Sequence, residues 1–408
     1  MPRLSQSFLI AAITLAGGIG AGLVFPIMPA LGLELGIPGF MIGVILSANR
    51  VSRLLFNFVA GGLYARLGPR LTMAGALAIE AVGMVMFSVA LVSAWPTAWL
   101  LAGRFVNGIG MAFLVIGAQA AVLAGSDHTN RGKRTAAFRT AFNASIPGGL
   151  ILGGVLADTY SNNAAFLVGA AVSAFGMGLA FLLDGRSRPP EPPGARKTLA
   201  QDSYRSLFTS PHRVALIASW IYSFFVFLTV QGALLSTLVL LVQERGMSVF
   251  GLDAQGTSSI AMTFMVGAAA LFTFAFGSVL DRLRLRSTLL FPCLIGLALG
   301  FFCLAQAQSV GLLFFGSVLT GLSYNFITVA MMALLGDTTT EAQHAPAVAV
   351  FQSAGDVGGI IGPMLGIELA LHWGIAPLYL SLGGLTLLCL LVALWLWRHE
   401  RAIAFANS

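Results

Sequence analysis

The sequence predicts an all-α membrane protein in which twelve transmembrane helices form two pseudo-symmetric six-helix bundles. Three observations support this fold class. The 408-residue chain is 57% hydrophobic and only 9% charged. Its apolar residues fall into twelve runs, each close to the roughly 20 helical residues that cross a hydrocarbon core about 30 Å thick. The second six runs also resemble the first six in sequence, which indicates an internal duplication.

The composition excludes a soluble domain and argues against nucleic-acid binding. Soluble domains carry about 25% charged residues, whereas this chain has a mean hydropathy of +0.89 and too few charges to cover a surface in water. The net charge of +7 comes from basic residues in short loops between the apolar runs. The three cysteines lie inside apolar runs and lack the spacing of zinc ligands. We therefore expect a lipid environment, with no nucleic-acid partner, no metal and no cofactor.

The predicted helices form two sets. The first set lies near residues 8–30, 39–65, 71–92, 97–124, 135–158 and 163–183. The second set lies near residues 213–243, 254–280, 288–306, 309–335, 346–371 and 376–397. The first run is too long for the core of a signal peptide and no cleavage site follows it, so we expect it to be retained. Residues 184–212 are polar and proline-rich, which predicts a cytoplasmic linker between bundles formed by residues 1–183 and 213–408.

The basic residues predict the orientation in the membrane. With the N-terminus inside, the inner loops, linker and tails hold seventeen of the 22 Lys and Arg residues, and the outer loops hold only Arg245. Because Lys and Arg concentrate in cytoplasmic loops, we expect both termini in the cytoplasm. The remaining basic residues lie within predicted helices, and they are Arg50, Arg53, Arg104 and Arg139.

Three pairs of short segments carry the internal repeat. They are FRTAFN (138–143) with FQSAGD (351–356), GGLYAR (61–66) with GSVLDR (277–282), and GRFVNG (103–108) with GSVLTG (316–321). The separation is 213, 216 and 213 residues in turn, so the register is nearly constant. A parallel duplication of six helices is typical of secondary transporters. It predicts a binding site near the middle of the membrane, between the halves.

The second predicted helix carries a polar stripe. Its members recur at three- and four-residue steps and are Asn49, Arg50, Arg53, Asn57 and Gly61. Arg53 lies about 18 Å from the inner end, near the middle of the membrane. Two interpretations stay open. Arg53 pairs with Glu80 of the next helix as a structural ion pair, or Arg50 and Arg53 line a cavity and bind a carboxylate or phosphate through their planar guanidinium groups.

Other charged residues inside the predicted helices are candidates for coupling transport to proton movement. Asp356 lies about 15 Å from the inner end of its helix. It could bind and release a proton as access alternates, or it could be a structural acid paired with an arginine. Arg104 could instead bond nearby backbone carbonyls, and Arg139 could reach the membrane surface. Since four arginines face only two well-buried acids, Glu80 and Asp356, the balance favours an anionic substrate. Gln119, Gln231 and Asn325 are further candidate ligands. Aromatic residues could line the cavity or belong to the core, and they are Tyr222, Phe224, Phe225 and Tyr324.

Three motifs resemble those of the major facilitator superfamily, over essentially the whole chain. In GGLYARLGPR (61–70), the loop signature is matched by Gly61, Leu63, Arg66, Gly68 and Arg70, although Ala65 stands where an acid is usual. In LAGRFVNGIGMA (101–112), the signature of proton-coupled members is matched by Arg104, Gly108, Gly110 and Ala112, with Asn107 in place of Gln. IPGGLILGG (146–154) is a degenerate version of the motif that exporters carry in their fifth helix. GGIIGPMLG (358–366) resembles that motif more closely, but it lies in the eleventh predicted helix. The chain also resembles the twelve-helix drug:proton antiporter branch.

The resemblance implies roles for two further groups. The expected cytoplasmic gate consists of Gly61, Arg66, Gly68, Arg70, Asp281 and Arg282. Without an acid at Ala65, we expect this gate to lock less tightly. Helix packing and bending are expected at Pro147, Gly148, Gly149, Gly358, Gly359, Gly362 and Pro363.

We therefore expect a secondary active transporter that works by alternating access and exports a small organic molecule in exchange for protons. The substrate is expected to be anionic or carboxylate-bearing. The alternative is proton-coupled uptake of an anionic metabolite or a metal chelator. A receptor would need a larger soluble domain, and an intramembrane enzyme would need a catalytic constellation, which the sequence lacks. We expect a multi-pass monomer in the plasma membrane, the inner membrane of a bacterium, with the bilayer, protons and substrate as its partners.

Overall fold

The computed structural model describes residues 6–124, 131–184, 207, 212–280 and 285–406. Within these ranges the secondary structure is helical, apart from one isolated bridge between Val249 and Leu252. Twelve helical segments of the described residues are long and apolar enough to cross a membrane. The chain is therefore an all-α, multi-pass membrane protein, and the predicted fold class is confirmed.

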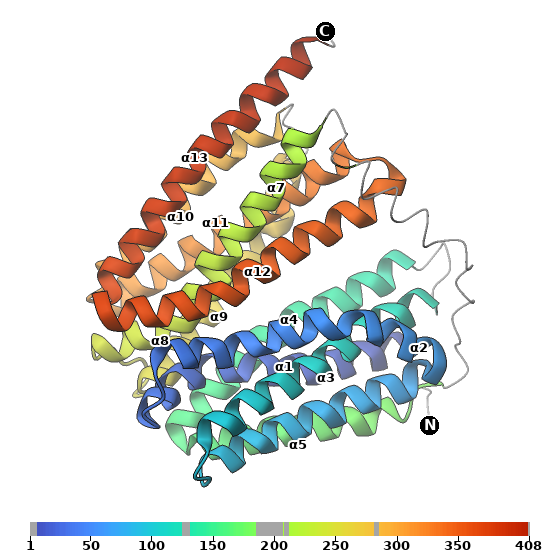
Figure 1. The fold of residues 1–408 in the computed structure, drawn as a ribbon, viewed down its shortest axis with the longest axis vertical. Coiled ribbons are helices and arrows are strands. Elements are labelled where there is room, and N and C mark those ends of the chain that lie inside the picture. The colour runs from blue at the N-terminus through green and yellow to red at the C-terminus, as the bar shows by residue number, and fades with distance from the viewer. Residues whose placement is uncertain (1–5, 125–130, 185–206, 208–211, 281–284, 407–408) are drawn as a thin grey trace. The chain divides into compact units, whose positions relative to one another are not determined.

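The helices fall into two compact units, which we describe separately (Figure 1). The first unit contains described residues up to 184 together with residues 238–263. Its N-terminal helices are α1 (Gln6–Glu34), α2 (Gly39–Ala90), α3 (Pro96–Ala124), α4 (Arg131–Thr159) and α5 (Asn162–Ala180). The chain then contributes to this unit the last part of α8 (Leu235–Glu244) and the start of α9 (Ala254–Leu280).

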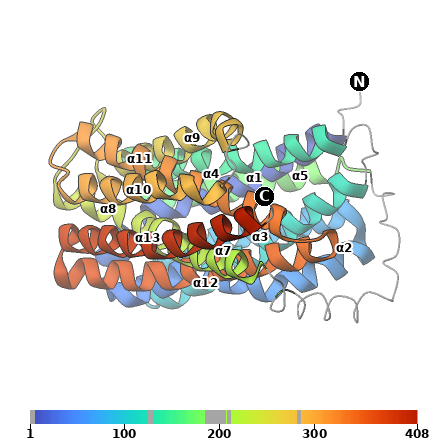
Figure 2. The same ribbon diagram turned by 90° about the horizontal axis from the view of Figure 1, so that it is seen from above.

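The second unit contains the described residues from 207 to 237 and from 264 onward. Its helices, besides the rest of α8 and α9, are α7 (Arg213–Val226), the π-helix η1 (Phe227–Leu234), the 3-10 helix η2 (Arg286–Leu289), α10 (Leu290–Ala305), α11 (Val310–Thr338), α12 (Glu341–Trp373) and α13 (Ile375–Ala406). Within this unit α10 packs against α11 and α13, and α12 packs against α7 and η1 (Figure 2). The division into bundles of residues 1–183 and 213–408 stays a prediction.

Two predicted helices meet at a tight kink. The runs near 39–65 and 71–92 form the two helical halves of α2, which are separated by the non-helical backbone of Gly68, with φ 74° and ψ 178°. Residues with a side chain rarely adopt a positive φ, so glycine is needed here. Pro69 follows directly and fixes the start of the second half. Gly68 of the GGLYARLGPR motif therefore has a structural role in turning the chain.

Glycines bring α1 and α4 into backbone contact. A Cβ on Gly22 would lie 2.5 Å from the carbonyl oxygen of Ile146, and one on Gly149 would lie 2.2 Å from that of Ile19. Gly153 approaches the carbonyl oxygen of Leu23 in the same way, at 2.3 Å. We call Gly22, Gly149 and Gly153 the glycine seam. No larger residue fits at these positions, which is the packing mode expected between membrane helices.

The second unit repeats this packing between α12 and the segment formed by α7 and η1. A Cβ on Gly358 would lie 2.1 Å from the carbonyl oxygen of Phe224, and one on Gly362 would lie 2.4 Å from that of Leu228. The predicted close packing at Gly149, Gly358 and Gly362 is thus observed. A Cβ on Gly148, in contrast, would meet only Ile19, at an ordinary 3.7 Å. Bending at these positions, at Gly359 and at Pro147 and Pro363 stays a prediction.

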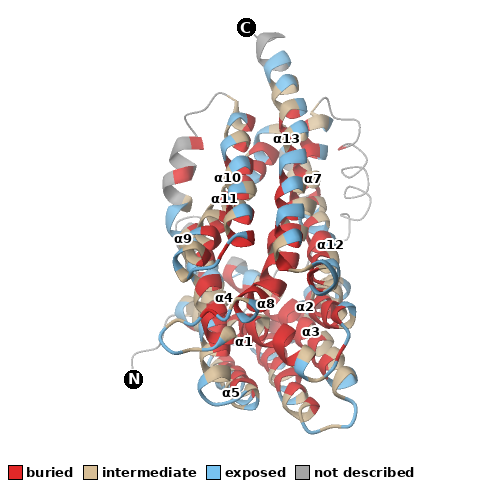
Figure 3. Cartoon of the chain, turned by 90° about the vertical axis from the view of Figure 1, so that its left-hand side faces the viewer, coloured by how far each residue is buried: buried red, intermediate tan, exposed pale blue. Residues whose placement is uncertain are grey.

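Many large apolar side chains face outward, as expected for helices that contact lipid. Figure 3 shows exposed residues along one side of several helices and buried residues along the opposite side. Leu271, Phe175 and Leu391 are 80%, 68% and 67% exposed. In water such a surface would promote aggregation, so it indicates contact with the bilayer.

Candidate functional site

A buried polar cluster joins the first half of α2 to α3. Asn49 donates a hydrogen bond from Nδ2 to Oδ1 of Asn107 over 2.9 Å. Ser52 donates from its hydroxyl to the carbonyl oxygen of Asn49 over 3.1 Å, and Arg104 donates from Nη2 to the carbonyl oxygen of Leu46 over 3.3 Å. We call Asn49, Ser52, Arg104 and Asn107 the α2–α3 polar cluster. Arg104 and Asn107 belong to the LAGRFVNGIGMA motif (101–112).

Gly108 allows the two helices to approach at this cluster. A Cβ at this position would lie 2.0 Å from the hydroxyl of Ser52 and 2.3 Å from the carbonyl oxygen of Asn49. Both contacts are far shorter than a Cβ tolerates. The motif glycine therefore sets the distance at which Asn49 and Asn107 can bond, which explains why it directly follows Asn107.

Arg104 is almost fully buried, with 2% of its surface exposed. Its guanidinium carbon lies 5.5 Å from the centre of the Phe25 ring of α1, a cation–π arrangement. Its Nε has no hydrogen-bond partner, and no carboxylate pairs with it among the described residues. Arg50 is near enough for the two positive charges to repel each other. The observed bond to a backbone carbonyl matches one of the sequence interpretations, but it uses only one of five N–H donors.

Glu80 is completely buried in the same unit. Neither carboxyl oxygen has a hydrogen-bond partner among the described residues, so the considered ion pair with Arg53 does not form. The side chain lies between two glycines instead. A Cβ on Gly17 of α1 would lie 2.9 Å from Oε2, and one on Gly110 of α3 would lie 2.7 Å from Cγ. Glu80 thus points toward α1 and α3, which accounts for the missing contact with Arg53.

The other predicted residues of the membrane interior occupy different environments. Arg50 and Arg53 are half-buried on α2, and Arg139 is exposed near the start of α4. Asp356 is 8% exposed on α12 of the second unit. The structure thus confirms that Glu80 and Asp356 are the buried acids, while the roles of all six residues in transport stay predictions.

The predicted gate residues lie around the turn of α2. Arg66 and Arg70 are exposed, and the guanidinium carbon of Arg70 lies 5.4 Å from the centre of the Phe181 ring. Gly61 has open space where a Cβ would be. Asp281 and Arg282 lie outside the described residues. A gating role for this group stays a prediction.

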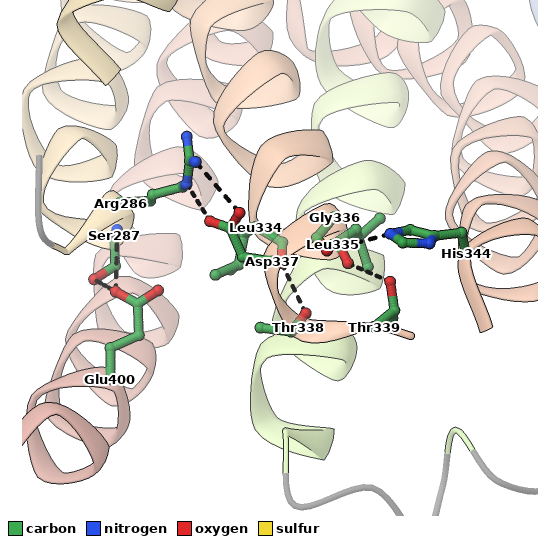
Figure 4. A network of polar contacts seen from close by, with 10 residues as sticks. All are labelled: Arg286, Ser287, Leu334, Leu335, Gly336, Asp337, Thr338, Thr339, His344 and Glu400. Atoms are coloured by element: carbon green, nitrogen blue, oxygen red, sulfur yellow. Dashed lines mark hydrogen bonds and ion pairs between the residues drawn. The ribbon is translucent and has the colours of Figure 1, made fainter. Parts of the chain in front are cut away.

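A network of polar contacts fastens one end of the second unit (Figure 4). Arg286, at the start of η2, forms an ion pair with Asp337 near the end of α11. Glu400 of α13 accepts hydrogen bonds from the hydroxyl and the backbone N–H of Ser287. Sequence reasoning counted Arg286 only as a loop charge. Arg286 occupies the position that the internal repeat relates to Arg70 of the loop motif, 216 residues earlier. This correspondence could have predicted that Arg286 forms a contact.

Gln231 and Tyr324 meet in the second unit next to the π-helix. Gln231 donates from Nε2 to the hydroxyl of Tyr324 over 3.0 Å, and the rings of Phe227 and Tyr324 lie 6.1 Å apart. Asn325 donates to the hydroxyl of Thr273 over 2.7 Å. Since π-helical turns are frequent at functional sites, this cluster keeps its place among the candidates.

No group of His, Cys, Asp and Glu side chains among the described residues could hold a metal ion. The expectation of no metal and no cofactor stays a prediction.

Comparisons with known proteins agree with this fold. The chain resembles the crystal structure of the nucleoside transporter NupG, with a TM-score of 0.78 and 15% identity over 96% of this chain and 99% of that chain. It also resembles a bacterial homologue of the human lysosomal transporter Spinster in an inward-facing, occupied conformation, with a TM-score of 0.76 and 14% identity over 98% and 97% of the two chains. At this identity the likeness shows the fold alone. No curated protein matches the chain in sequence.

The sequence model of the Major Facilitator Superfamily matches residues 10–254 and 247–408, which together cover almost the whole chain. This agrees with the twelve membrane-spanning segments, the duplicated motifs and the fold. The family is one of transporters and not of enzymes, so secondary transport is the general function that it supports. The chain belongs to the Major Facilitator Superfamily.

Proposed function

We propose that this chain is a proton-coupled secondary transporter that exports a small organic molecule with a carboxylate or another anionic group. The family supports transport itself. The observation that carries the finer proposal is that the first unit buries Arg104 and Glu80 without pairing them. The similar structures also include one described as informing substrate recognition in proton-dependent oligopeptide transporters, with 14% identity.

Two unpaired buried groups of opposite charge need an explanation. An isolated charge in a membrane interior costs several kcal/mol, so a purely structural arginine and glutamate would be expected to pair. Here each keeps its binding capacity for something else. Glu80 has two oxygens that could take a proton, and Arg104 has free N–H donors that could bind an oxyanion.

The position of Glu80 supports a link between proton exchange and helix movement. Its carboxyl group lies between Gly17 of α1 and Gly110 of α3 and is closed off from solvent. A proton could therefore exchange with water only when α1 and α3 separate. A helix movement of this kind is the event that alternating access requires.

The orientation and setting belong to the same proposal. The excess of Lys and Arg in alternate loops supports cytoplasmic N- and C-termini. We place the protein in the inner membrane of a bacterium and expect it to act as a single chain. Asp356 is the second candidate for proton coupling, and it lies on the other unit.

Transport by the full-length protein in proteoliposomes tests the proposal. An imposed pH gradient is followed with a trapped pH-sensitive dye while citrate, or tetraphenylphosphonium as an organic cation, is added. We expect citrate to release the gradient by exchange with protons. Glu80→Gln should abolish this release, whereas Glu244→Gln should preserve it because Glu244 is exposed on α8.

Three results would count against parts of this proposal. Release by tetraphenylphosphonium alone would indicate a drug:proton antiporter for cations. Movement of protons together with citrate would indicate uptake, the alternative for an anionic metabolite or a metal chelator. Unchanged coupling in Glu80→Gln would exclude Glu80 as the proton carrier.

A further inference from the structure

The first unit contains a cavity at the end where α1 and α4 terminate. Its volume is about 450 Å³. Polar residues of several helix ends line it: Glu34 of α1, Asp158 of α4, Asn162 of α5, Gln243 at the end of α8, Asp253 just before α9, and Gln255 at the start of α9. All of these residues belong to the same compact unit. A volume of this size is typical of sites for small organic molecules.

The wall of this cavity is acidic. It contains the carboxylates of Glu34, Asp158 and Asp253, and none of its described residues is Lys, Arg or His. Asp158 and Asp253 are close enough for their charges to repel each other. The neighbouring cation, Arg245, lies outside the wall and 3.8 Å from Glu244. The chain as a whole has a net charge of +7, so the sign of the charge at this wall is opposite to that of the whole chain.

Only one of the three carboxylates is engaged by the protein. Asp158 accepts a hydrogen bond at Oδ2 from the backbone N–H of Gly256 over 2.6 Å, at the start of α9. Glu34 and Asp253 have no side-chain hydrogen bond or ion pair among the described residues. Asp158 therefore has a structural role in holding α9, while the other two carboxylates remain available.

A second observation comes from the amide side chains of the wall. Gln255 is only 8% exposed, yet its Oε1 has no hydrogen-bond donor among the described residues. Oδ1 of Asn162 is also buried without a donor. A buried acceptor without a donor costs about 1–3 kcal/mol, so such groups are uncommon in native proteins. The wall thus has no positive charge and two buried amide oxygens that a ligand with N–H groups could satisfy.

The spacing of the acids argues against a metal ion as the occupant. The described carboxylates do not converge into a group that could hold a metal. The cavity is also many times larger than an ion. A ligand that forms an ion pair with each of the two available carboxylates would carry two positive charges.

We propose that this cavity binds a linear organic polyamine. Its ammonium groups would pair with Glu34 and Asp253, and its N–H groups would be directed toward Gln255 and Asn162. This site is distinct from the α2–α3 polar cluster. Nine residues of α1, or about 13 Å, separate Phe25, which covers Arg104, from Glu34. Under the predicted topology the end of α1 lies outside, so the polyamine reaches the cavity from the outer side.

Titration calorimetry on the full-length protein in detergent tests this site. Spermidine is compared with butylamine, Mg²⁺ and the neutral 1,4-butanediol, all at one ionic strength. We expect spermidine to bind with the highest affinity. Glu34→Gln and Asp253→Asn should each weaken binding about fivefold, because each removes one partly exposed charge pair. Glu244→Gln is the matched control, since Glu244 is an exposed acid outside the wall, and it should leave binding unchanged.

Several outcomes would overturn the proposal. These are no spermidine binding, equal affinity for Mg²⁺ or butylamine, and equal weakening in Glu244→Gln. Both wall acids are exposed, so their substitution should leave the melting temperature of the free protein unchanged, which is measured alongside. If one variant unfolds, the affinities of the unmodified protein for spermidine, butylamine and Mg²⁺ still test the proposal. The result is independent of citrate transport and of Glu80.

Discussion

Asn49 of α2 and Asn107 of α3 share a buried hydrogen bond of 2.9 Å. The bond uses Nδ2 of Asn49 and Oδ1 of Asn107 and leaves Nδ2 of Asn107 without a partner. This free amide and the free Nε of Arg104 lie one helical turn apart on α3. The α2–α3 polar cluster therefore contains two buried donors without a partner among the described residues.

A double-mutant cycle should detect the bond between these asparagines. Asn49→Ala and Asn107→Ala should each lower the melting temperature in detergent. The double variant should lose less than the sum of the two, with a coupling energy of about 0.5–1.5 kcal/mol. Strictly additive losses would show that the hydrogen bond contributes nothing to stability.

Gly108→Ala should destabilise the protein by about 1–3 kcal/mol, because the added methyl group would overlap Ser52 and the backbone of Asn49. Gly178→Ala is the matched control in α5, where a Cβ meets nothing within 4 Å. Thermal unfolding of the two variants measures the difference. A control that loses as much as Gly108→Ala would mean that the close approach of α2 and α3 is not the cause.

Gly68→Ala should cost about 1–3 kcal/mol for a different reason, namely backbone strain at φ 74°. Gly62→Ala, six residues earlier in α2, has open space around a Cβ and no positive φ. The yield of folded protein and the melting temperature should fall only for Gly68→Ala. Tolerance of alanine at Gly68 would indicate that the turn of α2 has another conformation.

Glu80→Gln should leave stability unchanged or raise it. The carboxyl group of Glu80 makes no hydrogen bond among the described residues, so the substitution breaks no contact and removes a buried ionisable group. Thermal unfolding in detergent measures this, alongside the loss of proton coupling. A large loss of stability would show that Glu80 has a structural partner in the folded protein.

Disrupting the ion pair between Arg286 and Asp337 should have a small effect. Their side chains are 21% and 51% exposed, and exposed pairs contribute about 1 kcal/mol or less. Asp337→Asn should lower the melting temperature slightly at low salt and hardly at all at high salt, because salt screens the pair. An effect that persists at high salt would indicate that the pair's geometry matters more than its charge.

The twelve spanning segments could be predicted because their length and apolar composition are set by the bilayer itself. Other features were not accessible in this way. The same run of apolar residues can form α-helical or π-helical turns, so the sequence did not predict the π-helix η1. The tight kink of α2 at Gly68 depends on a backbone angle and not on hydropathy.

The sequence predicted how deep the site residues lie in the membrane, but not which neighbouring helices their side chains face. Counting residues along a helix places Glu80 and Arg53 at similar depths in the membrane. It does not say that Glu80 turns toward Gly17 and Gly110. The acidic cavity was missed for a related reason. Glu34, Asp158 and Asp253 are about a hundred residues apart, and only the fold brings helix ends together.

The glycine seam, like the contact of α12 with α7 and η1 at Gly358 and Gly362, depends on close backbone approach and not on polar side chains. Gly22, Gly149 and Gly153 bring the backbones of α1 and α4 into direct contact. Dispersion forces of this kind do not change with ionic strength or acidity. Shifts in salt or pH would therefore loosen the ion pairs at the helix ends and titrate the buried acids while the contact between α1 and α4 persists. Changes in salt or pH can thus alter the charged positions of the first unit while the packing of α1 against α4 stays intact.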